Sequence, residues 1–543
     1  MKIDYLFIRS KFKNLNNVKI DFDEDNLMTV IVGRNGSGKS NVLEALVSIF
    51  RNLDLGEPPP FSYEIKYRLG EGEDTRWVII DSDPNRGTIA KNYEILVEYS
   101  SKSKNKAIHY LPISKLKRDK NGLSDFLPKF LFAYYSGPSD RLENYFRKHR
   151  DNFYRQMLYN KVDLKADIRP LFYAKPFHSQ FVLLAFFLTE QNDNEKQFLR
   201  DHLGIEDLDS VHFVMRKPSW AKNKDELFWG ASGVVREFLD VIYPHTLAPL
   251  KITRQEATSL TGNNIKNEFL HLYLPDVITL REFAKGLSQD VFFKMLESTL
   301  LSEIISEVSV RVKVVSSEQP LTFRELSEGE QQLLTVLGLL KFTGGKDSLF
   351  LLDEPDTHLN PAWAVKYLKF LRDFVPNHKT SHLLMVTHHP LAIAELEKEQ
   401  VQVMWSDKFF QVHSQAPEES PRGMGYAGIL TSDMFGLTST LDDPTENLLR
   451  ERRSLVEKDN LNLVDKGKLK DLDERIENLG FTTMHWDNSY RKYLQLRKQI
   501  EGDLFSDFDD ATPDILAQRK EIAKEIIGNI IDQENREQAD ETH

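Results

Sequence analysis

Hydrophobic and polar residues alternate at the start of the chain. The alternation covers residues 3–7 and 18–22, on either side of a turn-like stretch at 14–17. Such a pattern predicts a β-hairpin. The next apolar run, 28–32, is unbroken and ends in a glycine, as expected of a buried parallel strand. Apolar residues then recur at helical spacing from 42 to 50.

The pattern changes several times farther along the chain. Residues 63–114 have the polar turns typical of strands, whereas 142–241 indicates mainly helix, with prolines that exclude a long coiled coil. Strands are predicted again at 309–314, and more apolar runs follow between 326 and 437. The tail from about 445 is charged and low in glycine, and we expect it to be helical.

A glycine-rich loop joins the apolar run at 28–32 to the helix after it. Residues 33–40 read Gly-Arg-Asn-Gly-Ser-Gly-Lys-Ser, which matches the P-loop pattern at every specified position. Glycines let backbone N–H groups close around phosphate oxygens, and the helix N-terminus adds its positive dipole end. We expect Lys39 to bridge the β- and γ-phosphates of ATP and Ser40 to ligate Mg²⁺. The predicted ATP-binding residues are Arg34, Asn35, Gly36, Ser37, Gly38, Lys39, Ser40 and Asn41.

Another apolar strand, 348–352, ends in the carboxylates Asp353 and Glu354. Charge at the tip of a buried strand is costly unless a cation is near. We therefore expect Asp353 to bind Mg²⁺ together with Ser40, and Glu354 to polarise the attacking water as catalytic base. The alternative is an ordinary strand end with two solvated acids, which the P-loop upstream disfavours.

The segment 326–332, Leu-Ser-Glu-Gly-Glu-Gln-Gln, precedes an apolar helix. Its local interpretation is a capping box, with Ser327 as N-cap and Glu330 at the third helical position. A capped helix start with a glycine is also an anion site. The string resembles the signature motif of ABC ATPases of the RecF and SMC-like branch. That resemblance implies that Ser327, Gly329 and Glu330 meet the γ-phosphate held by a second copy of the chain.

A further apolar strand, 383–387, ends at His388, about 35 residues beyond the acid pair. This position is similar to that of the switch histidine of ABC ATPases, which implies a catalytic role for His388; a structural histidine is the alternative. Asn360, in His-Leu-Asn-Pro, lies where the family has its D-loop. It is also the predicted N-cap of a helix with Pro361 in its first position.

Together, the hairpin, P-loop, signature, acid pair and histidine resemble RecF/SMC-like ABC ATPases over residues 1–55 and 320–440. The resemblance implies an α/β fold of the ABC-type P-loop NTPases, with a split nucleotide-binding domain, a large, mainly helical insertion and a helical C-terminal tail. The expected parts are an N-terminal ATPase lobe with the P-loop and a β-rich subdomain (1–140), the helical insertion (141–308), the C-terminal ATPase lobe (309–440) and a helical extension (441–543).

The size of the insertion, the segment 433–437 and the helical tail look like stand-alone ATPases of bacterial anti-phage systems, of the Septu type and its retron-associated relatives. This resemblance implies ATP and Mg²⁺ as cofactors, a homodimer formed through the ATP sites and an HNH nuclease as partner. For retrons it also implies a reverse transcriptase with its DNA–RNA product. A RecF-like DNA-binding repair ATPase is the alternative. The long insertion argues against a transporter ATPase, and a purely structural module would show no turnover.

Composition narrows the setting. The chain has 543 residues, 40% apolar and 28% charged, with no cysteine and a net charge of −12. The lack of cysteine excludes disulfides, Fe–S clusters and thiolate zinc sites. No apolar run is long enough for a membrane and the N-terminus lacks a secretion signal, so we expect a cytoplasmic protein without membrane contact. The acidic balance restricts any nucleic-acid contact to local patches, of which the basic runs 115–120 and 147–155 are candidates.

The sequence leaves one element of the nucleotide site unassigned. The Q-loop glutamine of ABC ATPases has no clear counterpart; Gln180 is one candidate, and 132–137 could instead form the connection between lobes.

Glu64-Ile65-Lys66 resembles the triplet of a restriction-type nuclease, but such triplets are common on strand surfaces. An acidic cluster at 503–510 lacks a preceding strand and is interpreted as a loop. We therefore expect no nuclease site in this chain.

Overall fold

Seven strands form the central sheet, in the order β18-β17-β3-β16-β15-β8-β9. The computed structural model describes residues 1–99, 108–119, 122–158, 170–188, 193–221, 227–257, 264–343, 345–458, 462–481 and 513–540. The strands of the central sheet are β3 (Met28–Gly33), β8 (Phe130–Tyr135), β9 (Leu171–Tyr173), β15 (Ser348–Asp353), β16 (His382–Val386), β17 (Val401–Ser406) and β18 (Val412–Gln415).

Parallel pairing joins all neighbours in this sheet except β17 and β18, which are antiparallel. Strands β3, β16 and β15 are adjacent and buried along their whole length. The loops that follow them therefore leave the sheet at one edge, and they carry the P-loop, the histidine and the acid pair. Because β3 comes from the start of the chain and β15–β17 from its second half, the split nucleotide-binding domain and the α/β fold class are confirmed.

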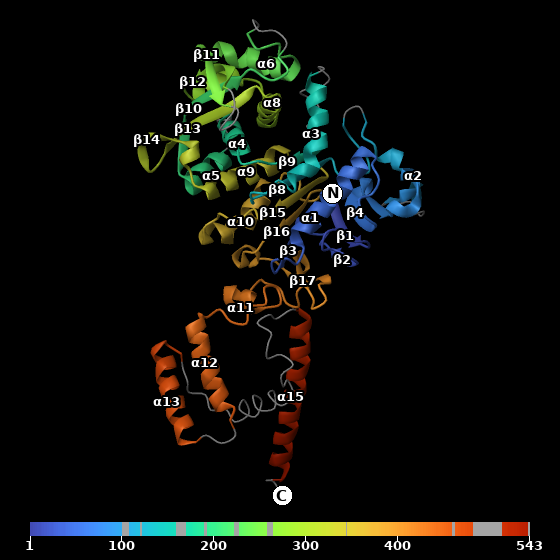
Figure 1. Ribbon diagram of the computed structural model, residues 1–543, viewed down its shortest axis with the longest axis vertical. Coiled ribbons are helices and arrows are strands. Elements are labelled where there is room, and N and C mark those ends of the chain that lie inside the picture. The colour runs from blue at the N-terminus through green and yellow to red at the C-terminus, as the bar shows by residue number, and fades with distance from the viewer. Residues whose placement is uncertain are drawn as a thin grey trace.

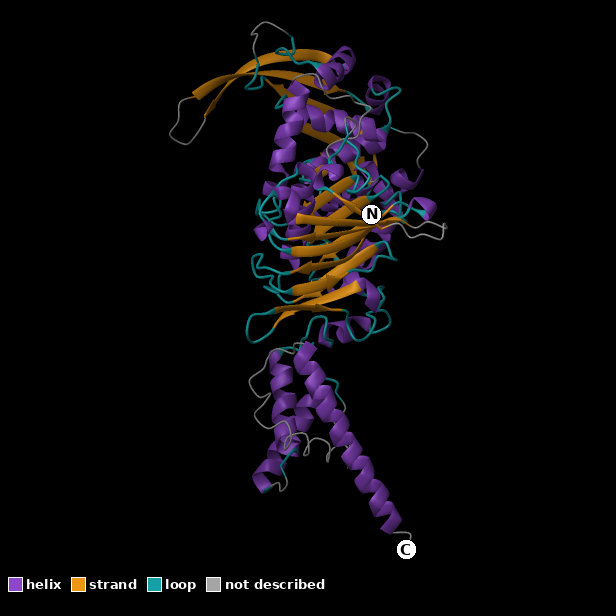
Figure 2. Ribbon diagram, turned by 90° about the vertical axis from the view of Figure 1, so that its right-hand side faces the viewer, coloured by secondary structure: helices purple, strands orange, loops and turns teal. Residues whose placement is uncertain are grey.

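The predicted N-terminal hairpin forms β1 and β2, which pair antiparallel. It belongs to a second sheet of order β2-β1-β4-β5-β6-β7. The strands added to it are β1 (Lys2–Ile8), β2 (Val18–Asp21), β4 (Tyr63–Leu69), β5 (Arg76–Ser82), β6 (Tyr93–Tyr99) and β7 (Ile108–Leu111). In Figure 2, orange strands occupy the middle of the molecule, between the insertion at the top and the C-terminal helices at the bottom.

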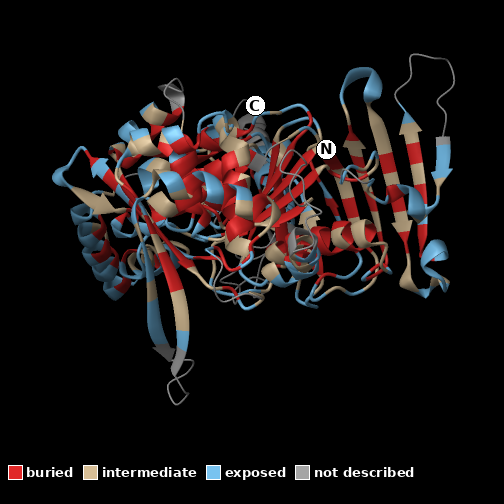
Figure 3. Cartoon of the chain, turned by 90° about the horizontal axis from the view of Figure 1, so that it is seen from above, coloured by how far each residue is buried: buried red, intermediate tan, exposed pale blue. Residues whose placement is uncertain are grey.

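Helices cover both faces of the central sheet. Successive residues of a strand point to opposite faces. Ile31 of β3 lies in one hydrophobic core with α1 and the second sheet, whereas Val30 and Val32 lie in another core with α9 and α10. Viewed from above, buried residues fill the space between these layers (Figure 3). The helices of the ATPase halves are α1 (Lys39–Leu55), α2 (Ile89–Asn92), α9 (Glu328–Thr343), α10 (Pro361–Phe374) and α11 (Gly425–Thr431).

The insertion between the two halves combines helices with a five-stranded antiparallel sheet of order β11-β12-β10-β13-β14, at the top of Figure 1. The helices agree with the sequence pattern, but the long strands β10–β12 were not predicted. Strand β10 has three register irregularities, which interrupt the alternation that marks a strand. The elements are α3 (Glu143–Leu158), α4 (His178–Phe187), α5 (Asp193–Leu203), β10 (Ile205–Arg216), α6 (Gly233–Ile242), β11 (Leu247–Ala257), β12 (Asn264–Leu274), α7 (Val277–Phe283), α8 (Gln289–Leu301), β13 (Ile305–Val314) and β14 (Ser317–Thr322).

The C-terminal extension is helical where the structure describes it, as expected. Helices α12 (Asp443–Val456), α13 (Leu463–Asn478) and α15 (Pro513–Asp540) extend from the end of the central domain opposite the insertion (Figure 1). A small core that includes Leu455 and Ile476 joins α12 to α13. In the described parts of the chain, no helix is both long and apolar enough to cross a membrane.

Candidate nucleotide site

The P-loop connects β3 to α1 as predicted, and its three glycines, Gly33, Gly36 and Gly38, all have positive φ. Gly36 has φ 83° and no heavy atom within 4 Å of where a Cβ would lie. Gly38 has φ 94°, and a Cβ there would lie 2.8 Å from Cδ2 of Leu15. A side chain at Gly38 would therefore meet both backbone strain and a close neighbour. The loop keeps the backbone exposed at Gly36, where a phosphate could approach.

Lys39 is buried at the start of α1. Its Nζ donates hydrogen bonds to the carbonyl oxygens of Gly33 and Arg34, each at 2.8 Å. Burial lowers the pKa of Lys39 to about 8, although the charges of Glu354 and Asp353 act in the opposite direction. The ammonium therefore lies inside the loop, next to both carboxylates, which is where it could neutralise phosphate charge.

Ser40 and Asp353 meet across the sheet edge. The Ser40 hydroxyl donates to Oδ1 of Asp353 at 2.9 Å, and Nη2 of Arg141 donates to Oδ2 at 3.0 Å. Burial raises the pKa of Asp353 to about 6, while the bonds from Ser40 and Arg141 act to lower it. A hydroxyl and a carboxylate oxygen are suitable ligands for Mg²⁺ beside nucleotide phosphates. The structure thus brings together the two predicted metal-binding residues, and adds Arg141, which the sequence analysis did not single out.

Glu354 and His388 face each other at the ends of β15 and β16. Nε2 of His388 lies 3.0 Å from Oε1 of Glu354. Glu354 has φ 52°, unusual for a residue with a side chain, and such strain is common at functional sites. Burial and the charge of Lys39 lower the pKa of His388, although Glu354 raises it. The ring is therefore neutral at pH 7, so the proton it presents to the carboxylate is on Nε2.

A buried network supports this pair from behind. The hydroxyl of Thr387 donates to Oδ2 of Asp356 at 2.6 Å. Burial raises the pKa of Asp356 to about 6. The side chain of Gln332, on α9, donates to the carbonyl of Glu354 at 3.4 Å and accepts from the backbone N–H of His358 at 3.2 Å. Gln332 belongs to the segment 326–332, but none of these contacts could be predicted from the sequence, because only the fold places the residues together.

The signature segment begins α9 with the predicted capping box. The backbone N–H of Glu330 donates to the Ser327 hydroxyl at 3.3 Å, and the Glu330 carboxylate accepts from the backbone N–H of Ser327 at 2.7 Å. Gly329 lies against the segment after β15, since a Cβ there would be 2.4 Å from the carbonyl oxygen of His358. Asn360 is the N-cap of α10 and accepts from the N–H of Trp363 at 3.0 Å. In the described part of the chain, the side chains of Ser327 and Glu330 bond only within this box, whereas the Ser327 carbonyl accepts from the N–H of Gln331 at 3.1 Å.

Two further contacts hold the rim of the P-loop. Asn14, in the turn of the N-terminal hairpin, donates to the carbonyl of Gly36 at 2.9 Å and accepts from Asn41 at 2.7 Å. Nη2 of Arg34 donates to the carbonyl of Gly436 at 2.9 Å. The P-loop is thereby connected to the hairpin before it and to the segment that leads into the C-terminal helices.

Of the remaining candidates, segment 132–137 reaches the site, since the backbone N–H of Ser136 donates to the carbonyl of Asp353 at 3.3 Å. Gln180 is buried on α4, where its Oε1 accepts no hydrogen bond, and segment 132–137 runs from β8 into the loop that carries Arg141. Glu64 accepts hydrogen bonds from Tyr5 and Arg9. The acidic cluster at 503–510 lies outside the described residues.

Much of the basic charge near α3 is balanced within the chain. Nε2 of His149 lies 2.6 Å from Asp54, which also pairs with Arg118. Lys148 pairs with Glu57, and Arg150 with Glu143 at 2.9 Å. Lys120 lies outside the described residues. These pairs favour a structural role for this part of the basic runs.

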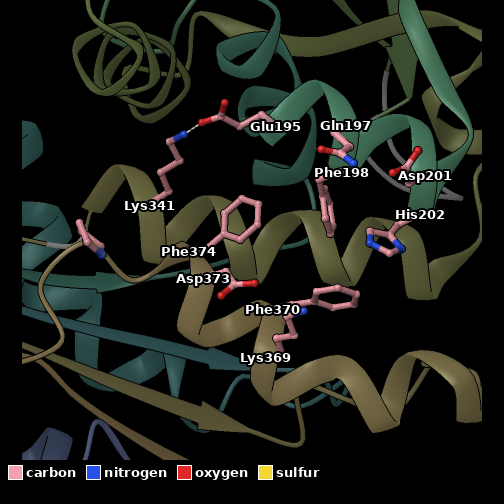
Figure 4. Close-up of a pocket in the computed structure, with 11 residues that line it drawn as sticks. Glu195, Gln197, Phe198, Asp201, His202, Lys341, Lys369, Phe370, Asp373 and Phe374 are labelled. Carbon is pink, nitrogen blue, oxygen red and sulfur yellow. Dashed lines mark ion pairs between the residues drawn. The ribbon is translucent and has the colours of Figure 1, made fainter. Parts of the chain in front are cut away.

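A separate hollow of about 660 Å³ lies between α5, α9 and α10 (Figure 4). Phe198, Phe370 and Phe374 line it, and Lys341 pairs with Glu195. Burial lowers the pKa of Lys341 to about 8. None of its lining residues belongs to the P-loop, so this hollow is not part of the candidate nucleotide site.

Comparison with known proteins agrees with this geometry. Residues 28–394 match the model of the family described as "AAA domain, putative AbiEii toxin, Type IV TA system". A curated relative, the Septu protein PtuA of Bacillus mycoides (strain KBAB4), is 25% identical over 241 residues, which are 41% of this chain and 33% of that protein. The alignment therefore spans about a third of the relative's length. The resemblance to Septu-type ATPases is confirmed at this level.

Two solved structures show a distant similarity to the chain. They are an SMC head domain from Thermotoga maritima (TM-score 0.32, 13% identity, 77% of this chain and 100% of that one) and Stu0660 of Streptococcus thermophilus (TM-score 0.25, 10% identity, 90% and 98%). Since the family model covers residues 28–394, which is more than half of the chain and includes the P-loop, the acid pair and His388, the protein belongs to this AAA-domain family of P-loop ATPases.

Proposed function

We propose that the protein binds ATP with Mg²⁺ and hydrolyses it in sites that two copies complete, and that this cycle regulates a partner effector in anti-phage defence. One observation carries the hydrolytic part: Oε1 of Glu354 lies 3.0 Å from Nε2 of His388, at the sheet edge that also holds Lys39. A phosphate-binding loop alone would suit many ligands. A carboxylate oriented by a neutral histidine beside that loop suits the activation of water.

The proposed chemistry assigns one task to each group. Lys39 binds the β- and γ-phosphates, and Ser40 with Asp353 would hold Mg²⁺, which neutralises charge on the phosphates when bound. Glu354 accepts a proton from the attacking water. His388 holds the carboxylate of Glu354 through Nε2 and lies where it could sense the terminal phosphate. Positioned proton transfer of this kind contributes about 10²–10⁴-fold to a rate.

The proposed homodimer follows from the signature helix. Ser327 is exposed and its hydroxyl bonds only to Glu330 of the same helix end. The N–H groups at this helix start, with Gly329 among them, form an anion site. A second copy could bring the γ-phosphate that this site lacks within its own chain. ATP would then favour the paired state and hydrolysis would release it.

The test of the hydrolytic assignment is Glu354→Gln in the full-length protein. We expect ATP binding to persist while steady-state phosphate release falls at least about 100-fold, because the amide cannot accept the proton. Glu395→Gln is the matched control, since Glu395 is similarly exposed and also contacts a basic side chain, that of Arg372, away from the site. Normal turnover by Glu354→Gln would disprove the role of this residue as base.

The partner assignment rests on the relative named above and on family resemblance. We propose an HNH nuclease as the effector, and, for a retron system, a reverse transcriptase with its DNA–RNA product. Co-purification with the products of neighbouring genes, followed by nuclease assays with and without ATP, tests this proposal. Absence of any ATP-dependent nuclease activity in the recovered complexes would refute it.

The alternative is a RecF-like repair ATPase that binds DNA by itself. The internal ion pairs of Arg118, Lys148 and Arg150 argue against a basic DNA surface around α3. DNA binding whose affinity falls steeply with salt, in the absence of any partner, would favour this alternative.

A further inference from the structure

Arg141 reaches the candidate metal site from the loop between β8 and α3. Strands β8 and β15 pair in parallel, with Tyr135 opposite Asp353. The loops after both strands therefore leave the sheet at the same edge as the P-loop. Arg141 lies on this loop, two residues before α3, and its guanidinium points back over the ring of Tyr135, with Cζ 4.7 Å from the ring centroid.

The contacts of Arg141 place a cation directly beside the proposed Mg²⁺ ligand. Its Nη2 donates to Oδ2 of Asp353 at 3.0 Å, while Ser40 donates to the other oxygen of the same carboxylate. The guanidinium and the Ser40 hydroxyl thus bind the two different oxygens of one carboxylate. A guanidinium and a divalent cation repel each other when both face one carboxylate in a site that is largely removed from water.

The side chain of Arg141 is held loosely enough to change partner. It is 37% exposed, whereas Asp353 is 2% exposed. Its Nε also forms an ion pair with Oε1 of the buried Glu44 at 3.6 Å, which is too long for a hydrogen bond. One hydrogen bond to Asp353, this longer ion pair and the contact with Tyr135 therefore hold the head group. A long, half-exposed arginine can move to a phosphate by rotation about its own side-chain bonds, and its planar fork suits a phosphate group.

Resting on the proposed function, we propose that Arg141 is a phosphate-sensing residue that moves from Asp353 to the terminal phosphate of ATP when Mg²⁺ binds at Ser40 and Asp353. ADP offers no terminal phosphate, so Arg141 stays on Asp353. The residue therefore acts by positioning and sensing, while Glu354 remains the base. Arg141 lies two residues before α3, the first helix of the insertion. Its change of partner from Asp353 to the phosphate therefore also signals to the insertion which nucleotide is bound.

The experiment measures the affinities of the full-length protein for ATP and ADP, each with and without Mg²⁺, by calorimetry. In Arg141→Ala, we expect ATP affinity in Mg²⁺ to fall roughly tenfold to hundredfold, the usual effect of losing one charged hydrogen bond, with ADP affinity within about threefold of normal. Arg141→Lys should recover part of the loss. Arg150→Ala is the matched control, since Arg150 also forms an ion pair at 2.9 Å but contacts no site residue.

Three results overturn the inference. These are equal losses of ATP and ADP affinity in Arg141→Ala, no loss of either, or a loss that is the same without Mg²⁺. If Arg141→Ala does not fold, as judged by thermal unfolding without nucleotide, Arg141→Gln and Arg141→Lys carry the same comparison. Failure of the unaltered protein to bind ATP at all would refute the proposed function as well, so the two failures can be told apart.

Discussion

Gly329, at the start of α9, packs against the segment that follows β15. A Cβ at Gly329 would be 2.4 Å from the carbonyl oxygen of His358. Real Cβ contacts do not fall below 3.0 Å. The Gly329→Ala variant must therefore move these two segments apart by at least about 0.6 Å, the difference between 3.0 and 2.4 Å. The neighbour is backbone and cannot rotate away. Overpacking of this kind costs about 1–3 kcal/mol of unfolding free energy. A shift approaching 1 Å in a reacting group can cost about 10²-fold in rate.

We therefore expect Gly329→Ala to lower ATP turnover by roughly 10–100-fold while ATP binding at Lys39 persists. The assays are phosphate release and binding of a fluorescent ATP analogue. Gly467→Ala is the control: Gly467 lies within α13, and no heavy atom lies within 4 Å of its Cβ position. That variant should gain about 0.5–1 kcal/mol of stability and keep its turnover. Normal turnover in Gly329→Ala would refute the idea that the signature helix and the D-loop must touch at this distance.

Three other changes test the site. Burial raises the pKa of Asp356 from 3.8 to about 6, so its ionised form costs the folded state about 3 kcal/mol, and stability falls as pH rises from about 4 to about 6. Asp356→Asn keeps an acceptor for Thr387 and should remove this pH dependence. Denaturant titrations at pH 7 should show a free energy of unfolding that is higher by about 1–3 kcal/mol. An unchanged dependence of stability on pH would contradict the assignment. Lys39→Ala should weaken ATP binding by at least about 100-fold in calorimetry, because the buried ammonium of the P-loop is lost, and normal affinity would place the phosphates elsewhere. His388→Ala should lower phosphate release by about 10-fold or more with little change in ATP affinity, since Glu354 loses the group that orients it; an equal loss of affinity would instead make His388 a binding residue.

The sequence predicted those parts of the site whose chemistry depends on residue order. The P-loop needs glycines at fixed spacing before a helix, and the acid pair and His388 each end an apolar strand, so these residues could be identified without a structure. The capping box at Ser327 and Glu330 is equally local. Their convergence at one edge follows from β3, β16 and β15 being adjacent and parallel.

Other parts could not be predicted, because they depend on contacts between distant segments. Arg141 lies 212 positions from Asp353 and forms no recognisable motif with it. Asn14 reaches Gly36 only because the hairpin packs against the P-loop. The strand at 309–314 was predicted and forms part of β13, but β10 and β11 were missed because the irregular register of β10 hides its alternation and because β11 is largely exposed. Strand propensity in such segments is decided by pairing partners that the linear pattern does not reveal.

The central claim is that each nucleotide site combines the P-loop of one copy with the signature helix of another. Mixing two inactive variants, Lys39→Ala and Ser327→Arg, tests it most directly. In a mixed dimer, one site joins an intact P-loop to an intact signature helix, and the other site has both parts broken. If two copies share the sites, an equal mixture should recover up to about one quarter of the normal ATPase rate, since half of the dimers are mixed and each has one working site. A rate no higher than the mean of the two separate variants would contradict the shared site.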